Sequence, residues 1–208
     1  MTRKLRIHPR KEASQSRSRA TVDALVDATA RILVREGFDK ASTNRVAEVA
    51  GVSVGSLYQY FPGKEALVAA VIERHSREIM QTVRAELAGI ATLPLQQGVA
   101  RLITAAVKAH RVDPRLHRVL AEQIPRVGKL EKVETFNRAN YSLFRDYLET
   151  RRHEIRDLDL DVASFVCVTS IEALTHNAVL HHPEMLQDDA MASLIDEGVR
   201  LVVRYLER

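Results

Sequence analysis

The sequence predicts an all-α fold in which an N-terminal three-helix helix-turn-helix domain is followed by a larger helical domain, with about nine helices in total. Apolar residues recur at three- to four-residue spacing in almost every segment beyond residue 18. No segment shows the alternation of apolar and polar residues that is typical of a half-buried strand. In the stretch TNRVAEVAGVSVGSLYQYFPGKEAL, residues 43–67, a glycine turn separates two short helical patterns.

The first helix is expected over residues 18–36, where six residues at helical spacing form one apolar face. Gly37 should end this helix, and Phe38 should then pack into the same small core. The apolar face consists of Val22, Leu25, Val26, Thr29, Ile32 and Leu33.

The next two helices are short, and each has a recognisable start and end. Ser42 or Thr43 can cap the first one through a side-chain hydroxyl, and Gly51 can adopt the left-handed conformation that closes it. Ser53 can cap the second one, which Pro62 stops. This is the helix-turn-helix pattern, whose second helix can enter the major groove of DNA.

The second of these helices has more polar and aromatic residues than its small inner face needs. Leu57 and Phe61 should face inward, and Gly55 leaves room for a phosphate or a base edge. An amide such as Gln59 can pair with adenine, whereas Tyr60 is expected to contact phosphate. The alternative is a short surface helix with its tyrosines packed on neighbours. The outward residues are expected to be Ser53, Val54, Ser56, Tyr58, Gln59 and Tyr60.

The residues AGVSVGSLYQYFPGKEAL closely resemble the helix-turn-helix of the tetracycline-repressor (TetR) family of bacterial transcriptional regulators. The similarity covers roughly residues 20–72 and includes the preceding GFDKAST, whereas the rest of the chain is similar only in length and helical pattern. Val54 stands where many members carry a polar or basic side chain. The resemblance implies that Lys64 contacts a phosphate. The predicted DNA-binding residues are therefore Thr43, Ser53, Val54, Gly55, Ser56, Tyr58, Gln59, Tyr60 and Lys64.

The charge distribution agrees with an N-terminal DNA-binding part. Residues 1–65 carry 12 Lys+Arg and 7 Asp+Glu, whereas the remainder carries 19 and 20, for a net charge of +4 overall. Residues 1–17 form a basic arm that we expect to be disordered in the free protein and to contact phosphates or a minor groove. A solubilising tail is the alternative. The predicted organisation is this arm, a helix-turn-helix DNA-binding domain over 18–65, and a helical ligand-binding and dimerisation domain over 66–208.

The larger domain is expected to contain six helices. The first begins at Gly63 or Lys64 and extends to about Gly89, and Pro94 opens the next one. Asp113 and Pro114 start a helix that should end at Pro125. The last three helices are expected over about 130–148, 161–180 and 189–207, the last of them capped by Asp188 or Asp189.

The helices over 161–180 and 189–207 have apolar faces that are too wide for one partner. A second copy of the chain could cover the rest of these faces in an intermolecular four-helix bundle. The result would be a two-fold homodimer, which the family resemblance also implies. The alternative is a monomer that buries both faces within one chain.

The larger domain should also bind an unknown apolar or amphipathic small-molecule effector, because it carries aromatic and polar residues on apolar helices. Glu172 and His176 share a helix face and could contact the ligand, or they could form a buried or interface pair. No metal site or cofactor is expected, because no clustered ligand motif is present. The candidate ligand-binding residues are Phe136, Tyr141, Phe144, Phe165, Glu172 and His176.

These features together predict a homodimeric one-component transcriptional repressor that binds a palindromic double-stranded DNA operator and is released by its ligand. A TetR-like regulator without ligand sensing and an activator are the alternatives. The sequence shows no catalytic constellation, so we do not expect an enzyme. The single cysteine, Cys167, the lack of a signal peptide and the lack of an apolar run long enough to cross a membrane predict a cytoplasmic protein.

Overall fold

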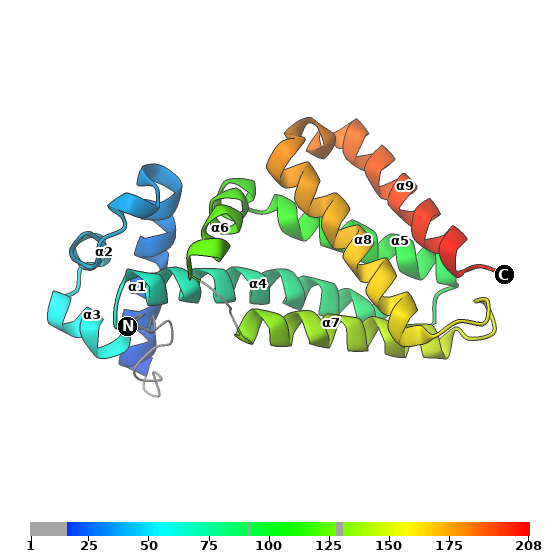
Figure 1. The fold of residues 1–208 in the computed structure, drawn as a ribbon, viewed down its shortest axis with the longest axis horizontal. Helices are drawn as coiled ribbons and strands as arrows, with labels where there is room; N and C mark the ends of the chain where they lie inside the picture. The colour runs from blue at the N-terminus through cyan, green and yellow to red at the C-terminus, as the bar shows by residue number, and fades with distance from the viewer. Residues whose placement is uncertain (1–15, 91, 128–130) are drawn as a thin grey trace, which may run out of the picture. The chain divides into compact units, whose positions relative to one another are not determined.

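A computed structural model describes residues 16–90, 92–127 and 131–208, except for the side chains of residues 17, 88, 122–127 and 131–137. The described residues form nine α-helices and two short 3₁₀ helices (Figure 1), which confirms the predicted all-α class. In the same residues, the only strand-like pairing is one isolated β-bridge between Ile155 and Glu207. The α-helices are α1 (Ser16–Glu36), α2 (Thr43–Ala50), α3 (Val54–Tyr60), α4 (Lys64–Gly89), α5 (Leu95–Arg111), α6 (Pro114–Val127), α7 (Glu131–Thr150), α8 (Leu160–His181) and α9 (Asp188–Leu206), and the 3₁₀ helices are η1 (Phe38–Lys40) and η2 (Pro183–Leu186).

The helices group into two compact units that do not follow the chain order. Met1–His75 and Arg115–Val133 form the first unit, and Ser76–Pro114 and Glu134–Arg208 form the second. Helix α4 therefore contributes to both units, and α6 belongs mainly to the first one. The functional division at residue 65 remains a prediction, because compactness alone does not assign a function to either unit.

The first unit has an apolar core built mainly from α1 to α4, to which α6 adds one buried residue and two half-buried ones. Leu57 and Phe61 are 0% and 1% exposed, as the helical spacing predicted, and Phe38 packs against the same core. The buried Thr29 hydroxyl donates to the Leu25 carbonyl oxygen over 2.8 Å, which satisfies its hydrogen-bonding capacity. Leu120 is the buried residue of α6. The apolar face of α3 is therefore packed into the core of the first unit.

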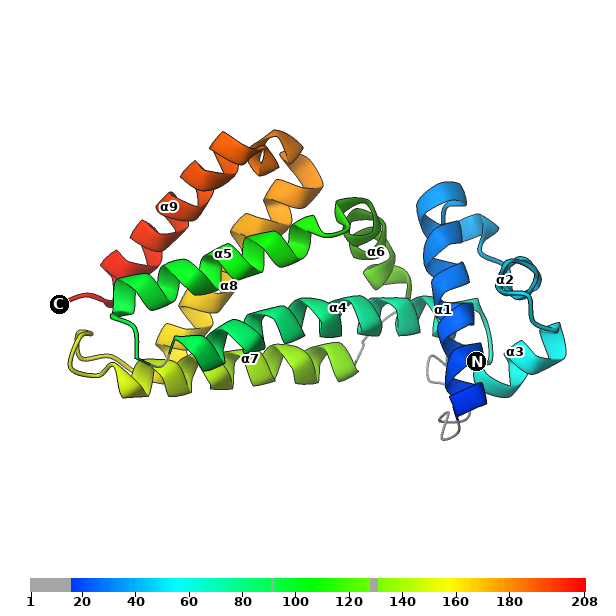
Figure 2. The ribbon, with the colours of Figure 1, turned by 180° about the vertical axis from the view of Figure 1, so that it is seen from behind.

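The second unit is organised around α5, which packs against both α8 and α9 (Figure 2). Gly98 lies where α5 meets Tyr147 of α7, and a Cβ atom at this position would overlap the tyrosine hydroxyl. The backbone N–H of Leu95 donates to a carboxylate oxygen of Glu154 over 2.8 Å, which satisfies one free amide at the start of α5. Both contacts fix the N-terminal end of α5 in the core.

Two helix boundaries differ from the predicted ones. Helix α6 does not end at Pro125 but continues to Val127. Proline in the last turn of a helix removes only one backbone hydrogen bond, so the helix can pass through it. Helix α9 has Gln187 rather than an aspartate at its N-cap, and Asp188 and Asp189 lie in the first turn, where negative charge is favourable.

Helix α8 is long and apolar enough to cross a membrane by length and composition alone, so the prediction that no stretch approaches this limit is wrong. A helix in the core of a soluble protein passes the same test, and 39% of the most apolar window of α8 is buried. The helix packs on α5 and α9, which explains part of its apolar surface.

The close contact at Gly98 leads to a prediction about stability. Gly98→Ala should lower the free energy of unfolding by about 1–3 kcal/mol, because overpacking displaces Tyr147 from a filled core. Chemical denaturation measures the change. Gly198→Ala is the matched control, since its added Cβ would meet Ile171 at an ordinary 3.4 Å and alanine favours helix. An equal loss of unfolding free energy in Gly98→Ala and Gly198→Ala would contradict overpacking against Tyr147 as the cause.

Candidate functional site

The geometry of the turn before α3 is set by two serine caps and one glycine. The Ser42 hydroxyl accepts from the backbone N–H of Arg45 over 3.3 Å, so Ser42 and not Thr43 caps α2. Gly51 has φ +70° and donates its N–H to the carbonyl oxygens of the last turn of α2. Ser53 then accepts from the Ser56 N–H over 3.1 Å and caps α3. Every connection in the predicted helix-turn-helix is thus specified locally.

Helix α3 buries one face and exposes the other. Val54 and Tyr58 are 37% and 41% exposed, and Gly55 and Gln59 are exposed with them. Tyr60 is only 8% exposed, so the expectation that it points outward is wrong. It follows the buried Leu57 by three residues, which places it on the same face of the helix.

Four further residues of the predicted DNA-binding set, Thr43, Ser53, Ser56 and Lys64, lie beside this exposed face in the chain. The Thr43 hydroxyl lies 3.1 Å from the Tyr58 hydroxyl, which connects the start of α2 to the outer face of α3. The Ser53 hydroxyl donates to that of Ser56 over 2.9 Å. Lys64 is the first residue of α4, and its ammonium lies 4.1 Å from the centre of the Phe38 ring. A cation–π contact of this kind positions the charge while its polar end stays accessible.

Arg45 occupies a different position, although it belongs to the same stretch of sequence. Its guanidinium bonds Glu36 over 3.2 Å and Glu48 over 3.1 Å, and these two carboxylates raise its pKa. The charge of Arg45 is therefore balanced within the first unit. The exposed face of α3 carries hydroxyl and amide groups, with Lys64 next in the chain.

The second unit contains a cavity among α4, α5, α7, α8 and α9. The space that no atom fills is about 670 Å³, including its opening to solvent. Three polar side chains, His110, Asn140 and Glu172, face a lining that is otherwise apolar. The apolar residues are Ile79, Val83, Leu87, Val99, Leu102, Ile103, Ala106, Phe144, Cys167, Val168, Ile171 and Val202. Such a lining, with few polar groups, is typical of sites for small organic molecules.

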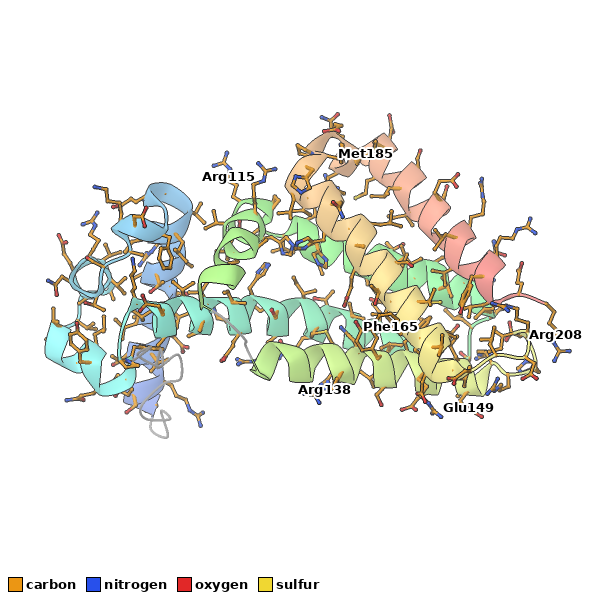
Figure 3. The ribbon with its side chains drawn as sticks, viewed as in Figure 1. Arg115, Arg138, Glu149, Phe165, Met185 and Arg208 are labelled. Atoms are coloured by element: carbon orange, nitrogen blue, oxygen red, sulfur yellow. The ribbon has the colours of Figure 1, made fainter. Side chains whose placement is uncertain are left out.

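Two of the six predicted ligand-binding residues, Phe144 and Glu172, line this cavity. Phe165 is 56% exposed (labelled on α8 in Figure 3), so its predicted place in a pocket is wrong. Tyr141 is not in the lining, and its ring instead stacks against that of Phe165 at 5.8 Å between centroids. His176 is also absent from the lining, and the side chain of Phe136 lies outside the described residues.

Among the described lining residues, Glu172 is the only acidic one, and burial raises the pKa of its carboxyl group. In the described part of the chain, no side chain or backbone N–H donates a hydrogen bond to it. The predicted Glu172–His176 pair is therefore not formed. The pKa of His176 is lowered by burial first and by the nearby His181 second, so this imidazole is not held in its charged form.

The other polar lining residues have partners. Nδ1 of His110 lies 2.8 Å from the Ala106 carbonyl oxygen, so this nitrogen carries a proton and donates. Burial raises the pKa of the Cys167 thiol to about 12, so the thiol stays protonated and unreactive. The described residues contain no group of three or more His, Cys, Asp or Glu side chains that could hold a metal ion.

His110 and Asn140 were missed as site residues, although the sequence contains a signal for one of them. Val99, Ile103 and Ala106 form an apolar stripe on α5, and His110 continues it at the next helical position. A polar residue at the end of an apolar stripe indicates a polar contact inside the core. The sequence offers no such signal for Asn140.

The raised pKa of Glu172 predicts a pH-dependent effect on stability. Folding disfavours the charged form, so the destabilisation is absent below the unfolded pKa, grows as the pH rises from the unfolded to the folded pKa, and is fully present above the folded pKa. Glu172→Gln should therefore raise the thermal midpoint of the unliganded protein more at about pH 8 than at about pH 4. Circular dichroism melts at both values measure this, with the exposed Glu149→Gln as control. A rise in the thermal midpoint that is the same at both pH values would contradict the raised pKa of Glu172.

Comparison with known proteins gives matches over both parts of the chain. Residues 25–71 match the family model described as bacterial regulatory proteins, tetR family. Residues 94–206 match the model described as tetracyclin repressor-like, C-terminal domain. Together these segments include α2, α3 and most of the residues that line the cavity.

Among curated relatives, the HTH-type transcriptional repressor KstR of Mycolicibacterium smegmatis is 41% identical over 66 residues, which are 31% of this chain and 32% of that protein. The chain spans about a third to about half the length of the first curated relatives that it matches.

Solved structures share the fold over most of the chain. A putative TetR-family regulator from Mesorhizobium loti has a TM-score of 0.70 at 18% identity, covering 93% of this chain and all of that one. The regulator FadR from Bacillus subtilis in complex with stearoyl-CoA has a TM-score of 0.67 at 18% identity, covering 87% and 97%. Identities this low establish the fold alone.

Proposed function

Because the chain belongs to the tetR family of bacterial regulatory proteins, whose members are transcriptional regulators and not enzymes, we propose that it is a homodimeric one-component repressor. It binds a palindromic operator in the bacterial cytoplasm through α3 and leaves the operator when a small molecule occupies the cavity. The observation that carries this proposal is the exposed face of α3, a helix that Ser53 caps at its N-terminus. The cavity of the second unit supports the ligand-dependent step.

The outer face of α3 is suited to DNA. Hydroxyl groups at Thr43, Ser53 and Tyr58 can donate to phosphate oxygens, and the Gln59 amide can read a base edge. Gly55 permits close approach of the backbone. Val54 offers a methyl contact rather than a polar one. Lys64 adds a charge at the start of α4, where a phosphate is also favoured by the helix amides. Tyr60 is buried, so we do not expect it to contact DNA.

The proposed dimer interface lies on α8 and α9. Large apolar side chains are exposed there, with Phe165 at 56% and Leu201 at 48%. Leu174, Leu194 and Leu201 also line a surface groove, which is bordered by the charged residues Glu197, Arg200 and Arg204. Exposed apolar groups with a charged rim are typical of an interface, and a two-fold axis would place both copies of each helix in a four-helix bundle. Two recognition helices would then read successive major grooves.

Helix α4 supports the proposed coupling between operator binding and ligand binding. Its first residue is Lys64, and Ile79, Val83 and Leu87 line the cavity further along the same helix. A ligand can release DNA only to the extent that it binds the DNA-incompetent state more tightly, and the coupling is reciprocal. Typical couplings are about 1–3 kcal/mol, or roughly 5–150-fold in affinity.

On DNA, Gln59→Ala and Lys64→Ala should have different effects. Gln59→Ala should change base preference and cost about 1–3 kcal/mol on the preferred operator. Lys64→Ala should weaken binding to all sequences and reduce the salt slope by about one counterion. Genomic fragments selected on the wild type provide the operator, and titrations at several salt concentrations measure both effects. A uniform loss for Gln59→Ala with unchanged preference would refute its base-reading role.

The dimer interface is tested with Leu201→Glu, which should convert the dimer to a monomer at micromolar concentration and abolish a symmetric footprint. The carboxylate would replace an apolar contact in the interface and would lose hydration there. Sedimentation velocity measures the oligomeric state. Val112→Glu is the control, because Val112 is 85% exposed but lies outside α8 and α9. A wild-type monomer with an asymmetric footprint would overturn the proposed dimer.

A further inference from the structure

Among the described residues that line the cavity, the polar groups provide acceptors for a ligand but no positive charge from lysine or arginine. In this described lining the only anionic group is Glu172. His110 and Asn140 already engage the Ala106 carbonyl and the Met80 sulfur. Glu172 has no hydrogen-bond donor in the described residues, although it projects from α8 into a mostly apolar space. In the described lining, Glu172 is therefore the ionisable acid that no protein donor compensates.

Such a carboxylate is unfavourable in the empty protein. Glu172 is half-buried, and a charged carboxylate that borders an apolar space loses part of its hydration without a protein donor to replace it. The raised pKa of Glu172 reflects the same penalty, which protonation relieves only in part. A ligand that brings its own positive charge removes the penalty when it binds.

We propose that the cavity binds an organic cation, a protonated amine on an apolar body, with the ammonium group paired to the Glu172 carboxylate and the body among the apolar helix faces. This inference rests on the proposed function, since it names the chemical class of the effector. The ammonium donates hydrogen bonds to the carboxylate oxygens. The apolar body contacts Val83, Ile103 and Ile171, each from a different helix.

Phe144 supplies a second contact for the same class of ligand. Its ring lines the cavity from α7, and an aromatic face attracts a cation at a distance within about 6 Å. An anionic amphiphile of the same length would bring a second carboxylate to Glu172, which is strongly unfavourable in a space of low dielectric. The cavity should therefore discriminate by the sign of the charge and not only by size.

The test uses three probes of the same chain length: octylamine, octanol and octanoate. At about pH 7 the first is a cation and the last an anion. Isothermal titration of the full-length protein should show the tightest binding for octylamine and no saturable binding for octanoate. Glu172→Gln should raise the dissociation constant of octylamine by roughly tenfold or more, since that ratio corresponds to the loss of one charge-assisted hydrogen bond. Octanol affinity should change little.

Glu149→Gln is the matched control, because Glu149 is exposed on α7 and outside the lining (labelled in Figure 3). It should leave all three affinities unchanged. Circular dichroism checks that both variants are folded. Equal affinities for octylamine and octanoate, no saturable binding of octylamine, or an octylamine affinity that does not depend on Glu172 would each overturn the proposal.

A parallel operator titration separates this inference from the proposed function. If octylamine binds through Glu172 but leaves operator affinity unchanged, the class of ligand stands and octylamine is not an effector. If a neutral or anionic compound releases the operator from the same cavity while octylamine does not bind, the inference is wrong and the regulatory function stands.

Discussion

The packing of α5 against α8 and α9 is the constraint on which the second unit depends. Gly98 and the Leu95–Glu154 hydrogen bond hold the N-terminal end of α5 closely against its neighbours. The residues from Val99 to His110 then face a space that the surrounding side chains do not fill. Protein interiors are normally close-packed, so a cavity of this kind sacrifices contact energy. A bound apolar molecule restores those contacts.

In the first unit, the corresponding constraint is that the seven-residue helix α3 has to be held at the surface. A helix this short is not stable alone, so its position must come from caps and from burial. Ser53 satisfies a free amide at its start, Gly51 sets the turn before it, and Leu57 and Phe61 anchor it. Burial of Tyr60 adds to this anchor. The outer face is thereby left free of any packing role.

Glu172 places an ionisable carboxyl group in a mostly apolar part of the second unit, which a core selected only for stability would avoid. An apolar residue of the same size would pack into α8 without loss of hydration. Local violations of this kind are expected at functional sites, where stability is exchanged for recognition. The contrast with Cys167, a protonated and unreactive thiol in the same lining, identifies Glu172 as the group with binding chemistry.

The sequence by itself determined the helical class, the helix-turn-helix and the inner face of α3, because caps, glycine turns and helical spacing are local signals. Two of its candidate ligand residues, Glu172 and Phe144, line the cavity, whereas Tyr60 is buried and Phe165 is exposed, against the expectation for each. Helix α8 is apolar around its whole circumference, so its composition could not indicate which side meets the core, the cavity or the solvent. Only the tertiary structure decided that Cys167, Val168, Ile171 and Glu172 face the cavity while Phe165 does not. The physical reason is that a cavity is created by five helices packed together, and no single helix carries the information about where the others leave space.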